Sequence, residues 1–444
     1  MKTKIAALLL CLGAGSAGAA ERVYHTTDAT CDGWPRAPIG MAKGFCAGIV
    51  VAPPEDFNTR TIRLPRVILP LPGGKDFLVT DTGKWNAAGG ALFRITAERG
   101  KPTVITPLLT DLYMPHAMSY GPDGKIGGKV YVNEQGRVFR FDPLAADPKS
   151  TIETVIADAP DTRTRYNFHP LSSFIFDTNN DMLLSVGAPS DQCLKDGKPD
   201  GTSFCAQSEG DYMAAGIRRY AYLGDGKWSP TFTVMARGLR NSVAMVRHRS
   251  GTLLQAENSE DFSAADSPFE ELNVLRQGAH YGWPYCYDMT GINPAWADAH
   301  VMDCNGPAYT QPVRLLPPHG APLSMLYYNG AMFPQLRGKL LIALHGYRPA
   351  GARIAAFTVD RRGIPLVTTN AQYDMYATPS GDETASLPYP GPASEPLLLT
   401  PGWNNVDGVH PRGSPVGMTV AQDGAIWVAE NNNGTILRIA RDKP

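Results

Sequence analysis

The sequence has almost no net charge and lacks the short motifs that mark many enzyme classes. It carries 41 Lys and Arg against 42 Asp and Glu, a formal net charge of −1, so bulk charge indicates neither a nucleic acid nor a membrane surface as partner. It contains no Walker-type glycine loop, no G-x-S-x-G and no H-E-x-x-H, and no Rossmann fingerprint placed between a strand and a helix. The sequence therefore shows no motif of the common nucleotide-binding proteins or hydrolases.

The N-terminus has the build of a secretory signal peptide. Two lysines precede an apolar run, Ile5–Leu12, and a small-residue pattern follows at Ala17–Ala19. The apolar run is too short to span a membrane. We therefore expect residues 1–20 to be a signal peptide, residues 21–444 to form a single domain, and the mature protein to be periplasmic or secreted without inserting into a membrane.

Cysteine spacing gives a second indication of an oxidising compartment. No C-x-x-C occurs, which excludes a C-x-x-C-H haem attachment and makes a cysteine metal site a weak alternative. Once Cys11 is removed with the signal peptide, six cysteines remain in three close couples. Three local disulfides are the simplest interpretation: Cys31 with Cys46, Cys193 with Cys205, and Cys286 with Cys304.

A strand pattern is repeated six times along the chain. Each copy is a short apolar strand, a turn with Asp, Asn or Gly, and a strongly apolar strand. The copies lie at 65–81, 115–142, 169–191, 240–258, 319–346 and 415–439. Because a four-stranded blade cannot bury both faces alone, six copies predict an all-β, six-bladed β-propeller.

Two further features refine this prediction. The strand at 44–52 is the natural candidate to close the ring with the last blade, and the growing spacing between copies predicts long insertions in the later blades, including the Pro-rich region 378–402. No long helix is evident. The alternative is a β-sandwich with coincidental turn spacing.

Basic or polarisable side chains stand at the start of each copy. Because the first strand of a propeller blade lies innermost, these side chains can gather at one end of the central channel, where a ring of cations would require an anion. Alternatively, these side chains form ion pairs with carboxylates in the channel, such as Asp81, Glu257 or Glu430. The positions are Arg66, His116, His169, Arg240 with Asn241, His319 and Arg412.

An oxygen-rich loop at 257–273 is a candidate metal site. Carboxylates and carbonyls at loop spacing suit Ca²⁺. The loop lacks the regular register of an EF-hand, so the spacing alone leaves open whether it is a solvated turn.

Three consecutive motifs resemble the soluble PQQ-dependent sugar dehydrogenases. They read "RGLRNSVAM", "LLQAENSEDF" and "EELNVLRQGAHYGWPYC", and the likeness extends over nearly the whole mature chain. In this glucose/sorbosone dehydrogenase family, which includes aldose sugar, L-sorbosone and pyranose dehydrogenases, a six-bladed propeller binds pyrroloquinoline quinone (PQQ) at the channel mouth through Ca²⁺. PQQ, with three carboxylates, would supply the missing anion.

The resemblance assigns roles to individual residues. His169 matches the catalytic base, which accepts the proton of the substrate hydroxyl while hydride passes to the quinone. Arg240 and Asn241 match a pair beside the quinone oxygen, where a guanidinium stabilises developing negative charge. The carbonyls of Ser259 and Glu260 take the place of the calcium ligands, although bacterial glucose enzymes have Gly-Pro there.

The chain departs from the bacterial glucose enzymes at two cofactor contacts. A lysine of the fifth blade is missing, which leaves His345, Arg348 or Arg353 as substitutes. A pair of arginines near the last blade is reduced to Arg412 with His410. The remaining predicted cofactor contacts are Arg66, His116 and His319.

The resulting hypothesis is a PQQ- and Ca²⁺-dependent dehydrogenase that oxidises an aldose or related sugar. Its electrons would pass to an external acceptor, a cytochrome or a quinone, and no nucleic acid is expected as partner. Two alternatives stay open: a calcium-dependent propeller lactonase, in which the metal activates water or a carbonyl, and a non-catalytic binding propeller.

Overall fold

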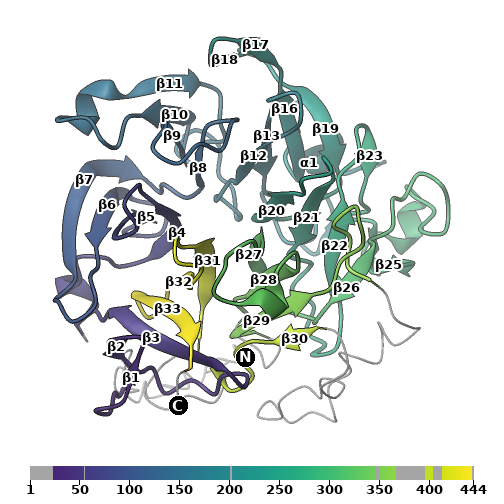
Figure 1. Cartoon of the computed structure of the whole chain (residues 1–444). Helices are drawn as coiled ribbons and strands as arrows, with labels where there is room; N and C mark the ends of the chain where they lie inside the picture. The colour runs from purple at the N-terminus through teal and green to yellow at the C-terminus, as the bar shows by residue number, and fades with distance from the viewer. Residues whose placement is uncertain are drawn as a thin grey trace, which may run out of the picture.

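Six small β-sheets are arranged around a central axis in the computed structural model (Figure 1). The structure describes residues 24–54, 56–200, 203–346, 351–366, 396–403 and 413–442. The predicted signal peptide lies outside these residues, as do Arg348, His410 and Arg412. The fold prediction of an all-β, six-bladed propeller is confirmed.

Each predicted copy forms the first strands of one blade. Blade 1 contains β4 (Pro65–Pro70), β5 (Asp76–Asp81), β6 (Ala88–Thr96) and β7 (Val104–Tyr113), and blade 2 contains β8 (Met118–Tyr120), β9 (Val130–Glu134), β10 (Arg137–Phe141) and β11 (Glu153–Ile156). Blade 3 contains β12 (Phe174–Phe176), β13 (Met182–Val186), β16 (Gly216–Tyr220), β19 (Thr233–Arg237) and a parallel edge strand, β23 (Ala279–His280).

The later blades follow the same order from the axis outward. Blade 4 contains β20 (Ala244–Arg247), β21 (Leu253–Glu257), β22 (Glu270–Val274) and β26 (Arg314–Leu316), and blade 5 contains β27 (Pro322–Tyr327), β28 (Leu340–Leu344), β29 (Arg353–Phe357) and β30 (Leu397–Leu398). Blade 6 contains β31 (Pro415–Val420), β32 (Ile426–Glu430), β33 (Thr435–Arg441) and β3 (Phe45–Val51).

The ring is closed by a strand from the other end of the chain. Strand β3 pairs antiparallel with β33 from Phe45 opposite Arg441 to Val51 opposite Ile436. This is the segment that the sequence predicts as the closing strand. Strand β3 is the fourth and outermost strand of the last blade, so both ends of the described chain are tied into one sheet.

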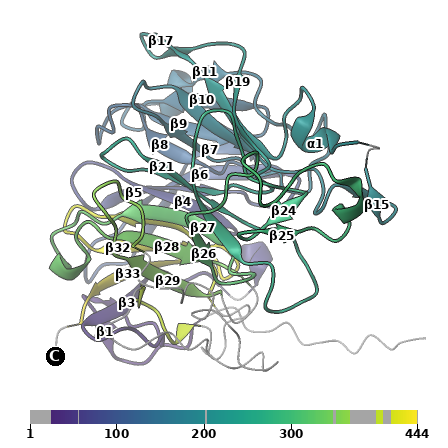
Figure 2. The same cartoon turned by 90° about the vertical axis from the view of Figure 1, so that its right-hand side faces the viewer.

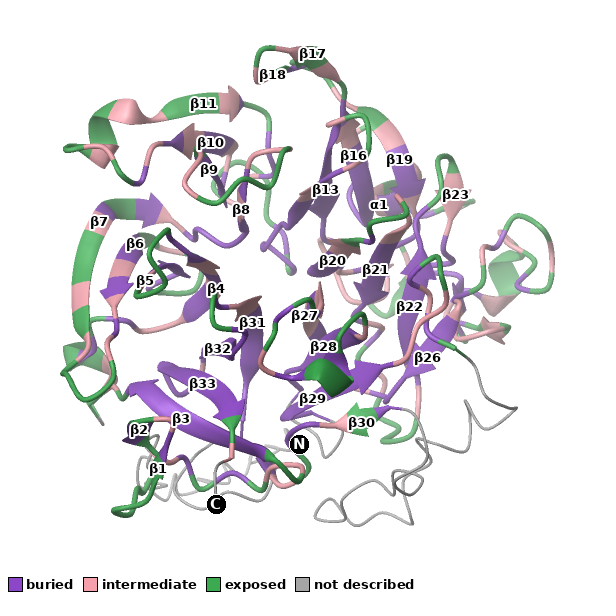
Figure 3. Ribbon diagram, viewed as in Figure 1, coloured by how far each residue is buried: buried purple, intermediate pink, exposed green. Residues whose placement is uncertain are grey.

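The hydrophobic core lies between neighbouring blades. The second strands β13, β28 and β32 are buried at every position, as Figure 3 shows by colour. Between blades 1 and 6, Phe77 stacks on Trp427 with ring centroids 3.8 Å apart. Burying one such side chain contributes about 1.5–3 kcal/mol, so stacked blades stabilise one another.

The three predicted disulfides are present. Cys31–Cys46 joins the N-terminal segment to β3, Cys193–Cys205 closes a loop between β13 and β16, and Cys286–Cys304 closes a loop between β22 and β26. The last two bridges staple the long insertions of blades 3 and 4, which Figure 2 shows gathered on one side of the ring. A disulfide of this kind restricts the conformations of the unfolded chain and so favours the folded state.

Outside the blades, the described elements are short. They are β1 (Thr30–Cys31), β2 (Trp34–Pro35), β14 (Leu194–Lys195), β15 (Lys198–Pro199), α1 (Ala206–Glu209), β17 (Tyr222–Gly224), β18 (Lys227–Trp228), β24 (Cys286–Tyr287), β25 (Gly291–Ile292) and the 3₁₀ turns Phe57–Thr59, Pro148–Thr151, Ala297–Ala299 and Pro334–Leu336. In the described part of the chain, no helix is long and apolar enough to cross a membrane.

Candidate functional site

A cavity of about 350 Å³ lies where the innermost strands begin. Because first and second strands are antiparallel, the start of one and the end of the next meet at the same end of a blade. Five blades therefore contribute to the cavity wall. The lining residues are Arg66, Trp85, Phe168, His169, Pro170, Leu171, Arg240, Asn241, Val243, Asn258, Ser259, Asp261, Glu270, His319, Ala321, Leu323, His345, Gly346 and Asn431.

Most of the described residues that the sequence nominates line this cavity. Those in the wall are Arg66, His169, Arg240, Asn241, Ser259, His319 and His345. His116 is buried behind Arg66, and Arg353 is buried within β29, away from the wall. The Glu260 side chain is also buried outside the wall. Arg348 and Arg412 remain predictions because they lie outside the described residues.

The carboxylates at the ends of the second strands accept hydrogen bonds from main-chain N–H groups. Asp81 accepts the N–H groups of Arg63 and Leu64 at 2.9 and 2.7 Å, and Glu257 accepts that of Asn241 at 2.7 Å. Glu430 accepts the N–H of Ser414 at 3.1 Å. These three carboxylates thus fix the chain just before the innermost strands, where backbone donors would otherwise be buried without acceptors. Within the described ranges, no ion pair of 4.0 Å or less joins them to His169 or Arg240.

Arg240 instead pairs with two carboxylates that the sequence did not single out. Its Nη2 lies 2.7 Å from Asp191 Oδ1 and 2.9 Å from Asp261 Oδ2. Its Nη1 donates to the Asn258 carbonyl at 3.0 Å. Burial alone would lower the pKa of this guanidinium, but the two aspartates and Glu260 raise it.

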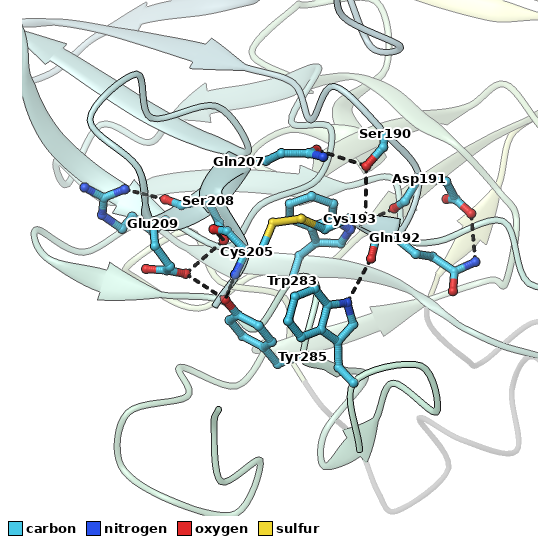
Figure 4. Close-up of a disulfide and its surroundings, with 12 residues drawn as sticks. Ser190, Asp191, Gln192, Cys193, Cys205, Gln207, Ser208, Glu209, Trp283 and Tyr285 are labelled. Carbon is cyan, nitrogen blue, oxygen red and sulfur yellow. Dashed lines mark hydrogen bonds between the residues drawn. A yellow bond between two sulfur atoms is a disulfide. The ribbon is translucent and has the colours of Figure 1, made fainter. Parts of the chain in front are cut away.

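Asp191 is held by the disulfide-closed insertion of blade 3 (Figure 4). Its carbonyl accepts the Trp283 indole N–H at 2.9 Å, and its Oδ2 accepts Gln192 Nε2, also at 2.9 Å. Trp283 and Tyr285 are buried around the Cys193–Cys205 and Cys286–Cys304 bridges, so they pack against disulfides and do not face the cavity. The two insertions therefore position the carboxylate that orients Arg240.

His169 is presented as a neutral base. Its Nδ1 lies 2.7 Å from the Ala188 carbonyl, an oxygen that can only accept, so Nδ1 carries the proton and Nε2 has a free lone pair. Burial, followed by the charge of Arg240, lowers the pKa of His169 to about 3. The imidazole is therefore uncharged at neutral pH.

The backbone around His169 is closely packed. Its N–H donates to Asn167 Oδ1 at 2.7 Å. A Cβ added at Gly187 would lie 2.4 Å from the His169 carbonyl oxygen, so only glycine fits opposite this residue. The ring of Phe168 meets the imidazole edge-on, with centroids 4.9 Å apart.

On the opposite wall, Arg66 lies among neutral histidines. Its Nε donates to His116 Nδ1 at 3.2 Å, which requires that nitrogen to be unprotonated. Burial and the Arg66 charge hold the pKa of His116 well below its usual value, and they lower the pKa of His345 to about 4. His345 Nε2 lies 2.8 Å from Asn431 Oδ1 and donates to it.

The nominated metal residues lie beside and beneath the cavity. The Ser259 N–H donates to Glu270 Oε2 at 2.7 Å, which fixes the main chain at the wall. Glu260 is 3% exposed, and its Oε1 has no hydrogen-bond partner in the part of the chain that is described. Burial raises the pKa of Glu260 to about 8. A buried oxygen without a donor is what a cation would satisfy.

Within the described ranges, no group of three or more His, Cys, Asp or Glu side chains is arranged to hold a metal ion. A metal at the wall would therefore depend on main-chain oxygens. His319 supports the same loop, since its Nε2 donates to the carbonyl of Ala264 at 2.7 Å. Its backbone has φ +55°, an uncommon value for a residue other than glycine.

The propeller thus brings a neutral imidazole and two guanidiniums together at one channel mouth. Residues 129–348 match the model of the Glucose / Sorbosone dehydrogenase family. The chain belongs to this family, as its motifs predict. An uncharacterized protein from Borreliella burgdorferi is 29% identical over 136 residues, which cover 29% of this chain but only 35% of that protein.

Solved structures share the fold. The holo form of the PQQ domain of pyranose dehydrogenase from Coprinopsis cinerea is 20% identical, with a TM-score of 0.62 over 93% of this chain and 100% of that chain. A calcium structure of a Trichoderma reesei enzyme of carbohydrate-active family AA12 is 18% identical, with a TM-score of 0.63 over 96% of this chain and 100% of that one. At these identities, the similarity establishes the propeller fold.

Proposed function

We propose that this protein is a PQQ- and Ca²⁺-dependent dehydrogenase that oxidises a sugar hydroxyl. The observation that carries the proposal is the joint placement of His169, Arg240 and Arg66 around one cavity. A neutral base beside fixed cations can both take a proton and stabilise negative charge. The family match and the PQQ domain among the similar structures support this assignment.

The residues of the cavity fit a planar, multiply charged cofactor. Arg66 lines the cavity, with its Nε bonded to His116, and a guanidinium in this position can bind a carboxylate of PQQ. Asn241 and Asn431 add amide groups to the wall. When bound, PQQ supplies an ortho-quinone that accepts the electrons of the substrate.

Calcium fits the loop that contains Ser259 and Glu260. The main chain of Ser259 is fixed at the wall, and the unpartnered Oε1 of Glu260 lies beneath it. Ser259 lines the cavity, whereas Glu260 lines a small pocket beside it, so a metal in the cavity would be held by Ser259 and one in the adjoining pocket could also reach Glu260. Hard oxygen donors of this kind favour Ca²⁺ over softer metals.

Each protein group has a defined task in the reaction. Nε2 of His169 takes the proton of the reacting hydroxyl, while Nδ1 stays bonded to the Ala188 carbonyl. Four N–H groups of Arg240 are held by the protein: Nε by the Asp191 carbonyl, Nη1 by the Asn258 carbonyl, and Nη2 by the carboxylates of Asp191 and Asp261. One of the five N–H groups, on Nη1, is left to face an oxygen that becomes negative. The protein thus provides base and charge stabilisation without moving its own groups.

Three disulfides support an oxidising compartment, and with the N-terminal pattern they favour the periplasm or secretion. The electrons would leave through an external acceptor, a cytochrome or a quinone. A soluble redox dye can replace that acceptor in an assay.

Reconstitution tests the proposal. The purified protein is mixed with PQQ and Ca²⁺, and a panel of aldoses is added while quinone absorption and dye reduction are recorded. We expect sugar-dependent quinone reduction, lost when EDTA removes the metal. Absence of both PQQ binding and dye reduction across the panel would reject the proposal. Hydrolysis of gluconolactone without quinone would indicate a lactonase, and PQQ binding without turnover a binding propeller.

A further inference from the structure

Two aromatic side chains at the cavity mouth have no role in the site described so far. Trp85 and Phe168 both line the cavity, and each is 50% exposed. A single exposed aromatic residue is ordinary on a protein surface. Two such rings on the wall of one cavity, contributed by segments from blades 1 and 3, indicate a surface that a ligand covers.

The protein holds Trp85 outward with a tightly built turn. Gly83 has φ +67°, and a Cβ there would lie 2.2 Å from the carbonyl oxygen of Gly89. The Gly83 N–H donates to Asp81 Oδ1 at 2.9 Å, and the Asn86 N–H contacts the Sδ of buried Met114 at 3.1 Å. The turn is thus anchored on both sides of Trp85, which fixes the main chain from which the indole projects.

Phe168 is fixed in a different way. Its ring packs edge-on against the His169 imidazole, and its N–H donates to the Pro189 carbonyl at 3.3 Å. Its exposed half therefore lies beside the proposed base. A sugar ring that presents a hydroxyl to Nε2 of His169 would rest against Phe168.

The cavity size places the substrate at the mouth. At about 350 Å³, the cavity is at the small end of the range for ligand sites, so a cofactor with three fused rings would fill most of it. The substrate must then bind outside the cofactor, where the half-exposed rings lie. Pyranoses with equatorial hydroxyls have faces lined by C–H groups, which pack on aromatic rings by dispersion and burial of apolar surface.

We propose that Trp85 and Phe168 form a two-ring sugar platform, and that the substrate is a saccharide of at least two pyranose rings. The reacting ring lies against Phe168, next to His169, and the following ring lies against Trp85. This inference rests on the proposed dehydrogenase function and names its substrate class. It predicts that the two aromatic residues affect monosaccharides and disaccharides differently.

Steady-state kinetics of the PQQ- and Ca²⁺-loaded protein tests the platform. With cellobiose or maltose, Trp85→Ala should raise KM about 3- to 10-fold with kcat nearly unchanged, and with glucose it should change neither. Phe168→Ala should raise KM for both sugar sizes. Trp85→Phe, which keeps a ring, should restore most of the disaccharide KM. Tyr166→Ala is the matched control, because Tyr166 is 66% exposed but does not line the cavity.

A binding measurement separates this inference from the proposed function. Saturation-transfer NMR of the disaccharide is recorded on loaded and unloaded protein, with circular dichroism to verify folding of each variant. Wild-type contacts that weaken in Trp85→Ala support the platform, even if no dehydrogenase activity is found and the proposed function fails. Normal activity with the same disaccharide KM in Trp85→Ala and wild type overturns the platform alone. Absence of both sugar contacts and activity overturns both proposals.

Discussion

The two arginines of the cavity differ in the partners to which the described structure bonds them. Arg240 forms ion pairs with Asp191 and Asp261. Arg66 donates to His116, a neutral imidazole, and a second neutral imidazole, His345, is close enough for Arg66 to lower its pKa. In the described structure, one guanidinium is thus bonded to carboxylates, and the other is bonded to an imidazole and lies near a second one.

This difference suggests that the two arginines have different tasks, one in turnover and the other in cofactor binding. A guanidinium already neutralised by the protein gains little from a second resting anion, but it is preoriented for charge that develops during a reaction. Arg240 lies close enough to His169 to lower the pKa of its imidazole, whereas Arg66 lines the cavity on another blade and can bind a carboxylate. We therefore expect the Arg240 wall to govern turnover and the Arg66 wall to govern cofactor affinity.

Removing the base beside Arg240 should have the largest effect. His169→Ala should lower kcat by about 10²- to 10⁴-fold, because no other group takes the proton at that position. PQQ affinity should stay within about threefold, since a neutral imidazole contributes no charge to anion binding. Dye-linked kinetics and PQQ fluorescence titration measure the two quantities separately.

The surface residue His300 provides the control for this variant. It lies in the exposed segment after Trp296 with φ +49°, so His300→Asn should leave both kcat and PQQ affinity unchanged. If His169→Ala turns over normally, the Arg240 wall is not the reacting wall. If it loses PQQ but not kcat at saturation, the two walls have the reverse assignment.

Removing Arg66 should affect affinity instead. Arg66→Met keeps much of the side-chain volume but removes the charge, and it should weaken PQQ binding about 10- to 100-fold. With PQQ at saturation, kcat should change by less than about threefold. Arg63→Met, three residues earlier and outside the cavity, is the matched control. Unchanged PQQ affinity in Arg66→Met would remove the distinction between the walls.

The sequence predicts the fold well because strand periodicity and blade closure are local or repeated signals. All six copies form blades, and the closing strand pairs as expected. The disulfides also follow from sequence, since each couple is separated by 18 residues or fewer. Such short-range patterns can be predicted from the sequence because the groups that meet are close along the chain, so that little loop-closure entropy opposes their contact.

The site could be predicted only in part. Position in the motifs places His169 and Arg240 correctly on the cavity wall, but nothing local pairs Arg240 with Asp191 and Asp261, which are 70 residues apart. Their meeting depends on two insertions whose paths no repeat specifies. Trp85 was missed for the same reason, since a turn residue has no periodic signal.

The smallest effect should separate the two carboxylates that hold Arg240. The Asp191 side chain is 29% exposed and the Asp261 side chain 69%, and ion pairs weaken as water screens them. Asp191→Asn should therefore lower the free energy of unfolding by about 1–2 kcal/mol, because Arg240 is left buried with only the more exposed partner. Asp261→Asn should cost less than about 0.5 kcal/mol. Urea denaturation of both variants measures the difference. Equal losses of unfolding free energy in the two variants would mean that the more buried aspartate does not hold Arg240 more strongly than the exposed one.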